Sequence, residues 1–356
     1  MGKGNINTMN AVDFFCGGGG MTRGLLNSGI DVMFGLDFNP ACQETYEYNN
    51  HIPYLCRDIK NVTIEELINE FPILTDNDEL LLVGCAPCQP FSSQRHSDTE
   101  HPAVNLLDEF GRMVEGMRPA HIVIENVPGI EKKGHEVFER FLLLLDRLNY
   151  QYIYDVVNAK NYGVAQNRRR LILIASRLFT PHIPEVTHGN GLLPYVTVRE
   201  RIFGFPQIGA GQENVDVPNH KAAGLSQLNL DRIMATPQNG GGRVDWPLEL
   251  QLNCHTNGHT GHTDVYGRMS WDAVAPTLTS KCYSLSNGRF GHPEQNRAIT
   301  LREAAAIQSF ENDYIFYGSM QEIGKQVGNA VPVLLAESIG RYILGEHIRV
   351  GNENEA

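Results

Sequence analysis

The sequence contains no long apolar run and no apolar leader. No segment approaches the roughly 18 consecutive apolar residues of a membrane span, and Met1 to Asn5 lack the apolar core of a signal peptide. The seven cysteines are scattered, and this odd number in a chain without a leader favours reduced thiols. We therefore expect a cytoplasmic protein without membrane contact. Its 356 residues suffice for one large domain and a smaller one.

Metal-binding spacings and positive charge are also scarce. Apart from Cys85 and Cys88, no cysteine spacing is typical of zinc, and His255, His259 and His262 lie in a polar segment more typical of loop or nucleic-acid contacts. We therefore expect no metal. The 29 Lys and Arg against 41 Asp and Glu give a formal net charge of −12, whereas nucleic-acid-binding proteins usually present a basic surface. Because binding depends on the face presented, this charge makes DNA a less expected partner without excluding it.

A glycine-rich turn near the start of the chain has the layout of a cofactor site. A strand predicted over 12–15 runs into Cys16 and four glycines, and a helix is predicted from about Met21 to Asn27. This layout brings backbone N–H groups close to the polar end of a cofactor. By itself the turn is equally compatible with NAD, another nucleotide or a plain tight turn.

Acidic residues recur at the ends of the next two predicted strands. Asp37 ends the strand over 31–37, about 20 residues after the glycines, a spacing that suits a carboxylate bound to ribose hydroxyls. Phe38 beside it offers an apolar face for an adenine ring, and Asp58 lies in a strand predicted over 54–59. Taken alone, each acid could equally be a solvated carboxylate at the end of a strand. Together they favour a cofactor that contains adenosine.

The segment from Gly84 to Ser93 holds a cysteine placed for chemistry. It follows the apolar run 79–83, predicted as a buried parallel strand, and in open α/β sheets ligands collect beyond the carboxyl ends of the strands. Cys88 is open to three interpretations: a buried structural thiol, part of a thioredoxin-like C-x-x-C, or a nucleophile toward carbon. Pro87 and Pro90 argue against the helix that a thioredoxin-like site needs.

An acid and three arginines mark two further apolar strands. The run 121–127 predicts a buried strand that ends in Glu125 and Asn126. A carboxylate at the end of such a strand is desolvated, which favours its protonated form, so we predict that Glu125 is a proton donor. Residues 168–170 are arginines that enter the strand predicted over 171–175, and we expect some of them to hold an anion or a carbonyl oxygen.

The alternation of strands and helices predicts the α/β fold class up to about Leu178. From Thr180 to about Arg297, Pro, Gly, Asn and His are frequent and amphipathic helices are scarce. This composition and the scarcity of helical patterns predict a second domain of mixed or mostly β character. Helical patterns return at 301–310 and 332–344.

Six motifs, in order along nearly the whole chain, resemble those of the DNA (cytosine-5)-methyltransferase family. Each is weak alone, but six in this order make a chance match very improbable. The D-P-P-Y motif of amino-methyltransferases is absent, as is the C-F-T stretch of the family's tRNA-methylating branch. The motifs are Asp13–Gly20 (D-x-F-x-G-x-G-G), Gly84–Ser92 (around P-C-Q), Glu125–Val127 (E-N-V), Gln166–Arg170 (Q-x-R-x-R), Arg302–Gln308 (R-E-x-A-x-x-Q) and Gln326–Pro332 (around G-N).

The resemblance implies S-adenosylmethionine (SAM) as cofactor and methyl transfer to C5 of cytosine in a short duplex DNA sequence. It implies a Rossmann-like catalytic domain over residues 1–185 and 322–350. A smaller, mostly β target-recognition domain with a hinge would occupy 186–321, and 351–356 would be an acidic tail.

The resemblance also assigns roles to single residues. A thiolate adds to C6 of a flipped-out cytosine, so that C5 can accept the methyl group. Cys88 is then the nucleophile, Glu125 supports the ring N3, and Arg170 holds O2. The other residues assigned to catalysis are Asn126, Gln166 and Arg168. The residues assigned to the cofactor are Phe15, Gly17, Gly19, Gly20, Asp37, Phe38, Asp58, Ile59, Pro87, Asn329 and Ala330. Among the residues expected to contact DNA, Thr277 resembles the family's phosphate-contacting threonine. Ser92, Gln94 and Arg95 lie in the loop expected to close over the flipped base, and Arg243, Lys281 and Arg289 are candidates for reading base edges by their residue type.

Two alternatives stay open at this point. The same chemistry could methylate cytosine in RNA, or the chain could be a catalytically inactive DNA-binding relative. The second is disfavoured because Cys88, Glu125, Arg168 and Arg170 are all present. We expect a monomer in the bacterial cytoplasm, on the nucleoid when bound to double-stranded DNA. A cognate restriction endonuclease that acts separately is a conceivable further partner.

Overall fold

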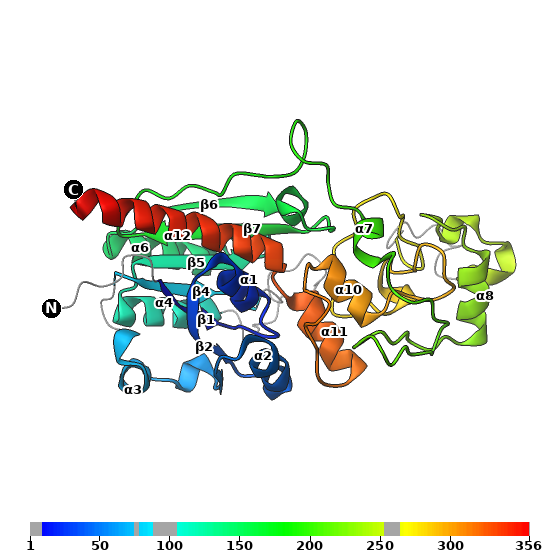
Figure 1. The fold of residues 1–356 in the computed structure, drawn as a ribbon, viewed down its shortest axis with the longest axis horizontal. Coiled ribbons are helices and arrows are strands. Elements are labelled where there is room, and N and C mark those ends of the chain that lie inside the picture. The colour runs from blue at the N-terminus through cyan, green and yellow to red at the C-terminus, as the bar shows by residue number, and fades with distance from the viewer. Residues whose placement is uncertain (1–8, 75–77, 88–104, 253–263, 356) are drawn as a thin grey trace. The chain divides into compact units, whose positions relative to one another are not determined.

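The computed structural model describes residues 9–74, 78–87, 105–252 and 264–355. They form two compact units (Figure 1). The first unit takes in 1–158, 169–186 and 333–356, and the second takes in 159–168 and 187–332. Thus 159–168 and 322–332 group with the second unit, unlike in the predicted domain boundaries. The functional assignment of these units stays a prediction.

The first unit is built on one seven-stranded sheet in the order β3-β2-β1-β4-β5-β7-β6 (Figure 1). Strands β1 to β5 pair in parallel, whereas β7 runs antiparallel to both of its neighbours. The chain winds from β1 outward to β3 on one side and through β4 on the other, which makes the carboxyl end of β1 a topological switch point. The strands are β1 (Asn10–Phe14), β2 (Asp31–Asp37), β3 (Tyr54–Cys56), β4 (Leu80–Gly84), β5 (His121–Asn126), β6 (Gln151–Asn158) and β7 (Arg169–Ser176).

Helices cover both faces of this sheet. Successive residues of a strand point to opposite faces. Phe14 packs against Phe110 of α4, with ring centroids 5.7 Å apart, and its neighbour Asp13 bonds to Thr22 of α1. Helices α4 and α1 therefore lie on opposite faces. The helices of this unit are α1 (Gly20–Ser28), α2 (Gln43–Asn50), α3 (Ile64–Glu70), α4 (Leu106–Met117), α5 (Ile130–Lys133), α6 (His135–Arg147) and α12 (Val333–Glu355).

Helix α12 is longer than the helix predicted over 332–344. It continues through 351–355, so the predicted acidic tail is the last turn of a helix. It packs closely on α1, where Gly24 leaves room for the backbone of α12: a Cβ at this position would lie 2.6 Å from Glu337 N. In the described ranges, no helix has the length and apolar character needed to cross a membrane.

The α/β class is confirmed by the sheet, but the second unit is not mostly β. Its described residues, 187–252 and 264–332, contain turns, isolated β-bridges and helices. Arg268 explains how such a chain packs without a sheet: its buried guanidinium donates to the carbonyls of Ile233, Thr236, His292 and Gln295 at 2.7–3.0 Å. One side chain thus satisfies backbone groups that a sheet would pair with each other. The helices are α7 (Val198–Ile202), α8 (Gln227–Ala235), α10 (Leu301–Ile307) and α11 (Met320–Asn329).

Candidate active site

The glycine-rich turn joins β1 to α1 and is held by Asp37. Phe15, Gly17 and Gly19 have φ values of 62°, 50° and 87°, a left-handed backbone that favours glycine. Asp37, at the end of β2, accepts a hydrogen bond from Gly17 N (3.1 Å). No side chain caps the N-terminus of α1, and its first turn, which includes Gly20, holds no acid. This end of the helix suits an anionic group.

Three further residues predicted to hold the cofactor follow β2 and β3. Phe38 comes directly after Asp37 and is 64% exposed, and burial raises the pKa of the Asp37 carboxyl. The predicted strand 54–59 is wrong in its second half: it ends at Cys56, because Asp58 accepts from Lys60 N (3.0 Å) and caps a 3₁₀ turn. Ile59 is buried in that turn.

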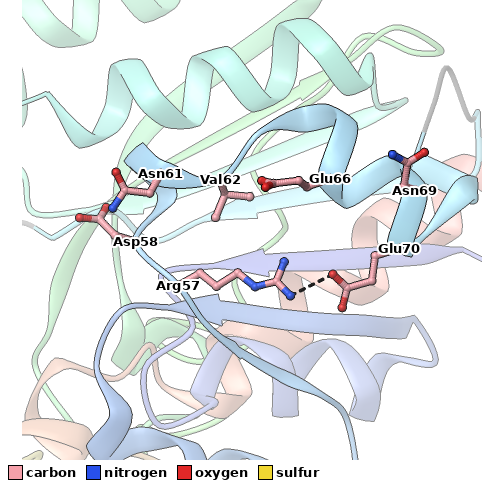
Figure 2. Close-up of a pocket in the computed structure, with 7 residues that line it drawn as sticks. All are labelled: Arg57, Asp58, Asn61, Val62, Glu66, Asn69 and Glu70. Carbon is pink, nitrogen blue, oxygen red and sulfur yellow. Dashed lines mark hydrogen bonds and ion pairs between the residues drawn. The ribbon is translucent and has the colours of Figure 1, made fainter.

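Asp58 also borders an open hollow of about 800 Å³ on the surface of the first unit. Figure 2 shows that Arg57 and Glu70 pair across it (3.0 Å), whereas Asp58 lies beside Asn61, away from this pair. Asp58 is the one residue of the hollow that was also predicted to bind the cofactor. The other residues that line it are Asn61, Val62, Glu66 and Asn69. The residues that line this hollow do not include those of the glycine turn.

A buried acid, Asp13, lies near the end of β1, just before the glycine turn. Asp13 is fully buried, and its Oδ2 accepts from Thr22 Oγ1 (2.7 Å), whose hydroxyl is also 2.9 Å from Tyr46 Oη. Burial, reinforced by Asp37, raises the pKa of the Asp13 carboxyl to about 7. We had not predicted Asp13 as a site residue, although it is the first letter of the D-x-F-x-G motif.

The segment that leads into Cys88 is anchored at both sides. Cys85 N donates to Phe14 O (3.2 Å), and Asn126 Nδ2 donates to Ala86 O (3.2 Å). Pro87 follows, half-buried. Burial, with Asp13 and Glu125 nearby, raises the pKa of the Cys85 thiol well above its usual value. The predicted residues Cys88, Ser92, Gln94 and Arg95, and the three histidines His255, His259 and His262, lie outside the described residues.

Glu125 and Arg170 form an ion pair. Arg170 Nε lies 2.9 Å from Glu125 Oε1, with both side chains about nine-tenths buried (12% and 9% exposed). The antiparallel pairing of β5 with β7 sets Glu125 opposite Ile172, two residues from Arg170. The sequence pattern had indicated a desolvated acid without a charge partner near it in the chain. The sheet supplies that partner.

The second unit gathers the other half of the arginine motif. Gln166, fully buried, donates to Gln308 Oε1 (2.8 Å) and accepts from Leu278 N (2.9 Å). Arg168 donates to Leu278 O and Gly328 O, both at 3.2 Å. These side chains therefore tie backbone segments together, as positioning residues do. In the part of the chain that the structure describes, no cluster of His, Cys, Asp and Glu could hold a metal ion.

The predicted DNA contacts differ in how far their side chains are already engaged. Thr277 Oγ1 donates to Asn167 O (2.6 Å), whereas Lys281 is exposed. Arg289 donates to three backbone carbonyls, those of Gly240, Gly241 and Arg268. Its guanidinium therefore holds a loop of the protein and is less available to contact a base. The remaining predicted residues of this unit are Arg243 in a 3₁₀ turn and Asn329 and Ala330 at the end of α11.

Comparisons with known proteins agree on one family. The C-5 cytosine-specific DNA methylase family matches residues 9–345. The Type II methylase M.HgiDII of Herpetosiphon aurantiacus is 40% identical over 348 residues, which cover 95% of this chain and 97% of that protein. The Type II methyltransferase M1.HphI of Haemophilus parahaemolyticus is 32% identical over 344 residues, 94% of this chain and 86% of that protein.

Solved structures share the fold at low identity. The crystal structure of a DNA modification methyltransferase encoded within an E. coli prophage has a TM-score of 0.74 and 21% identity, covering 95% of this chain and 99% of that one. Spodoptera frugiperda DNMT2 has a TM-score of 0.63 and 17% identity, covering 93% and 98%. With the matches in sequence, the chain therefore belongs to the C-5 cytosine-specific DNA methylase family and is a SAM-dependent DNA (cytosine-5)-methyltransferase.

Proposed function

We propose that the protein methylates C5 of a flipped-out cytosine in a short duplex DNA sequence through a covalent bond between Cys88 and C6. The observation that carries this proposal is the Glu125–Arg170 ion pair. Asn126, the residue after Glu125, donates to the carbonyl of Ala86, two residues before Cys88. An acid and a guanidinium side by side match the N3 and O2 edge of cytosine.

The first unit fits SAM on several observations. The α1 N-terminus has no side-chain cap and suits the cofactor's carboxylate, and the Asp37 carboxylate suits the ribose hydroxyls. Phe38 offers an exposed ring for the adenine. Bound there, the cofactor supplies an electrophilic methyl group on a positively charged sulfur.

The chain's own residues then prepare the cytosine. The Cys88 thiolate forms a bond to C6, which places electron density on C5, and Glu125 supports N3 with a proton while Arg170 donates to O2. After C5 has taken the methyl group, C5 loses its proton, the S–C6 bond breaks and the N3 proton returns to Glu125, which releases the product and the thiolate. An unperturbed cysteine is only a few per cent thiolate at neutral pH, a handicap of about 2 kcal/mol that nearby positive charge reduces.

Base flipping follows from the same chemistry, because C6 is covered in the base stack. Extruding the cytosine costs a few kcal/mol, which contacts in the pocket offset. Gln166 and Arg168 act in this proposal as positioning residues, since both are buried and bonded to backbone. Thr277 and Lys281 remain the proposed contacts to DNA in the second unit, with Arg243 and Arg289 as weaker assignments.

The test combines product mapping with trapping. Bisulfite sequencing of DNA from cells that express the protein identifies the methylated sequence. A duplex that carries 5-fluorocytosine at that position is then incubated with the protein and SAM, since fluorine on C5 blocks release. Intact-protein mass spectrometry should show a DNA adduct that Cys88→Ala lacks. No adduct with the wild type would contradict the proposal, and faster methylation of tRNA than of duplex DNA would redirect it to RNA.

Partners and location are proposed on the relatives alone. Both relatives named above are Type II enzymes. We infer that this protein acts as a monomer on DNA in the bacterial cytoplasm, and that any cognate endonuclease is a separate protein.

A further inference from the structure

Asp13 occupies a position that an ionised carboxylate would find unfavourable. The side chain is 0% exposed, and Oδ1 has no hydrogen-bond partner, while Oδ2 accepts one bond from Thr22. A buried carboxylate with one oxygen unsatisfied requires either a proton or a nearby cation. Because Asp13 lies four residues before Gly17, the first glycine of the turn, that cation can come from what the turn binds.

Among the residues that the structure describes, the groups that interact with Asp13 are acidic or neutral. Asp37 of β2 and the thiols of Cys16 and Cys85 interact with it electrostatically, and Tyr46 of α2 contacts it through Thr22. Farther along, Glu125 of β5 interacts with Cys85, and Arg170 of β7 pairs with Glu125. Without a bound cation, these surroundings raise the pKa of the Asp13 carboxyl, so that much of it stays protonated at neutral pH.

We propose that Asp13 senses the charge on the cofactor's sulfur: it is ionised when SAM occupies the site, and it returns to the protonation equilibrium of the empty site when the demethylated product S-adenosylhomocysteine does. This inference rests on the SAM-dependent activity and adds a residue that distinguishes donor from product. The two molecules carry the same amino and carboxyl groups and differ by the sulfonium charge. The Asp13 proton passes to solvent as SAM binds, and a proton returns from solvent once the sulfur is neutral.

The proposal makes a quantitative statement about pH. With its pKa at about 7, Asp13 in the protein alone is about one-tenth ionised at about pH 6 and nine-tenths ionised at about pH 8. If SAM binds the ionised form, its affinity rises about tenfold between these pH values, and about half a proton is released per SAM at about pH 7. The affinity for S-adenosylhomocysteine changes much less.

Isothermal titration calorimetry of the full chain, without DNA, tests this directly. SAM and S-adenosylhomocysteine are titrated at three pH values between about 6 and 8, each in two buffers of different protonation enthalpy. Asp13→Asn keeps an acceptor for Thr22 but cannot ionise, so it should lose the pH slope and the released proton. Titration of the cofactor itself is common to both proteins and cancels in this comparison.

Two variants complete the design. Asp31→Asn removes an exposed carboxylate from the opposite end of β2 and should keep the full slope. Thr22→Val removes the hydrogen bond that lowers the pKa of Asp13, so the midpoint of the slope should move to higher pH. If Asp13→Asn fails to fold, the shift of the pH midpoint in Thr22→Val still tests whether Asp13 is the group that titrates.

Equal slopes for SAM and S-adenosylhomocysteine in the wild type, a flat affinity for SAM, or an unchanged slope in Asp13→Asn would each overturn the proposal. These measurements need neither DNA nor Cys88. A protein that shows the slope but forms no fluorocytosine adduct would contradict the covalent mechanism alone, and the reverse pattern would contradict the role of Asp13 alone.

Discussion

Arg170 Nε lies 2.9 Å from Glu125 Oε1, although the two residues are 45 positions apart in the chain. If this pair supports the cytosine ring during attack, Arg170→Ala and Glu125→Gln should each lower kcat for DNA methylation by about 10²–10³, the usual effect of losing one group that stabilises developing charge. Because both act on one ring, the double variant should lose less than the product of the two effects. Single-turnover transfer of labelled methyl groups measures this.

Arg169→Ala is the matched control, since Arg169 lies beside Arg170 on β7 but is exposed. Its kcat should stay within about twofold of the wild type, as for most surface substitutions. Wild-type rates for Arg170→Ala would remove this pair from the mechanism.

Cys85 and Cys88 separate nucleophilic chemistry from redox chemistry. Burial raises the pKa of the Cys85 thiol, which leaves it neutral and a poor nucleophile. Cys85→Ala should therefore methylate DNA within a few-fold of the wild-type rate, and Cys88→Ala should show no methylation in the same assay. A thioredoxin-like site predicts that both substitutions abolish activity, so an inactive Cys85→Ala protein that still folds would reopen that interpretation.

The positions of the site residues along the strands could be predicted from the sequence, because they follow from local patterns. Apolar runs bounded by Gly, Asp or Asn placed Asp37 at the end of β2 and Glu125 near the end of β5, as the structure has them. The ion pair of Glu125 with Arg170 could not be predicted, because it depends on the register between β5 and β7.

The second unit was misread for a related reason. Its frequent Gly and Pro are typical of the turns of a β domain, whereas four of its backbone carbonyls accept hydrogen bonds from the Arg268 side chain. The carbonyls that Arg268 bonds lie 24–35 residues away in the chain, and no local pattern marks them as its partners. Likewise, the D-x-F-x-G motif includes Asp13, but the sequence does not indicate that its Oδ1 is buried without a hydrogen-bond partner.

Gly24 controls the contact between α1 and α12. An added Cβ would approach Glu337 N and Val333 O, both at 2.6 Å, and backbone atoms cannot move aside as a flexible side chain can. Gly24→Ala should therefore lower the free energy of unfolding by about 1–3 kcal/mol, the cost of overpacking. Gly345→Ala, in open space on α12, should instead raise it by about 0.5–1 kcal/mol through helix propensity. Urea unfolding compares the two, and equal effects would contradict the packing argument.

We predict that His121 and His347 make the stability of the first unit depend on pH. His121 Nε2 lies 3.1 Å from His347 Nδ1 on α12, and His121 Nδ1 lies 3.0 Å from Ser176 Oγ. Burial lowers the pKa of His121 to about 3, with His347 and Arg177 adding to the effect, and burial also lowers the pKa of His347.

The sign of the pH dependence follows from these lowered values. Below about pH 6.5 the unfolded chain binds a proton on each histidine that the folded protein refuses, so stability is complete above this pH and is lost as the pH falls toward the folded-state value. Each histidine contributes up to about 1.4 kcal/mol per pH unit, and protonation of His121 alone should lower the free energy of unfolding by about 2 kcal/mol between about pH 6.5 and 5.

Urea unfolding across this range should show a smaller dependence of the free energy of unfolding on pH in His121→Gln than in the wild type. His135→Gln removes a histidine whose side chain is 59% exposed and should leave the slope unchanged. If both variants keep the wild-type slope, the buried pair does not govern this transition, and the acid sensitivity must come from the carboxylates.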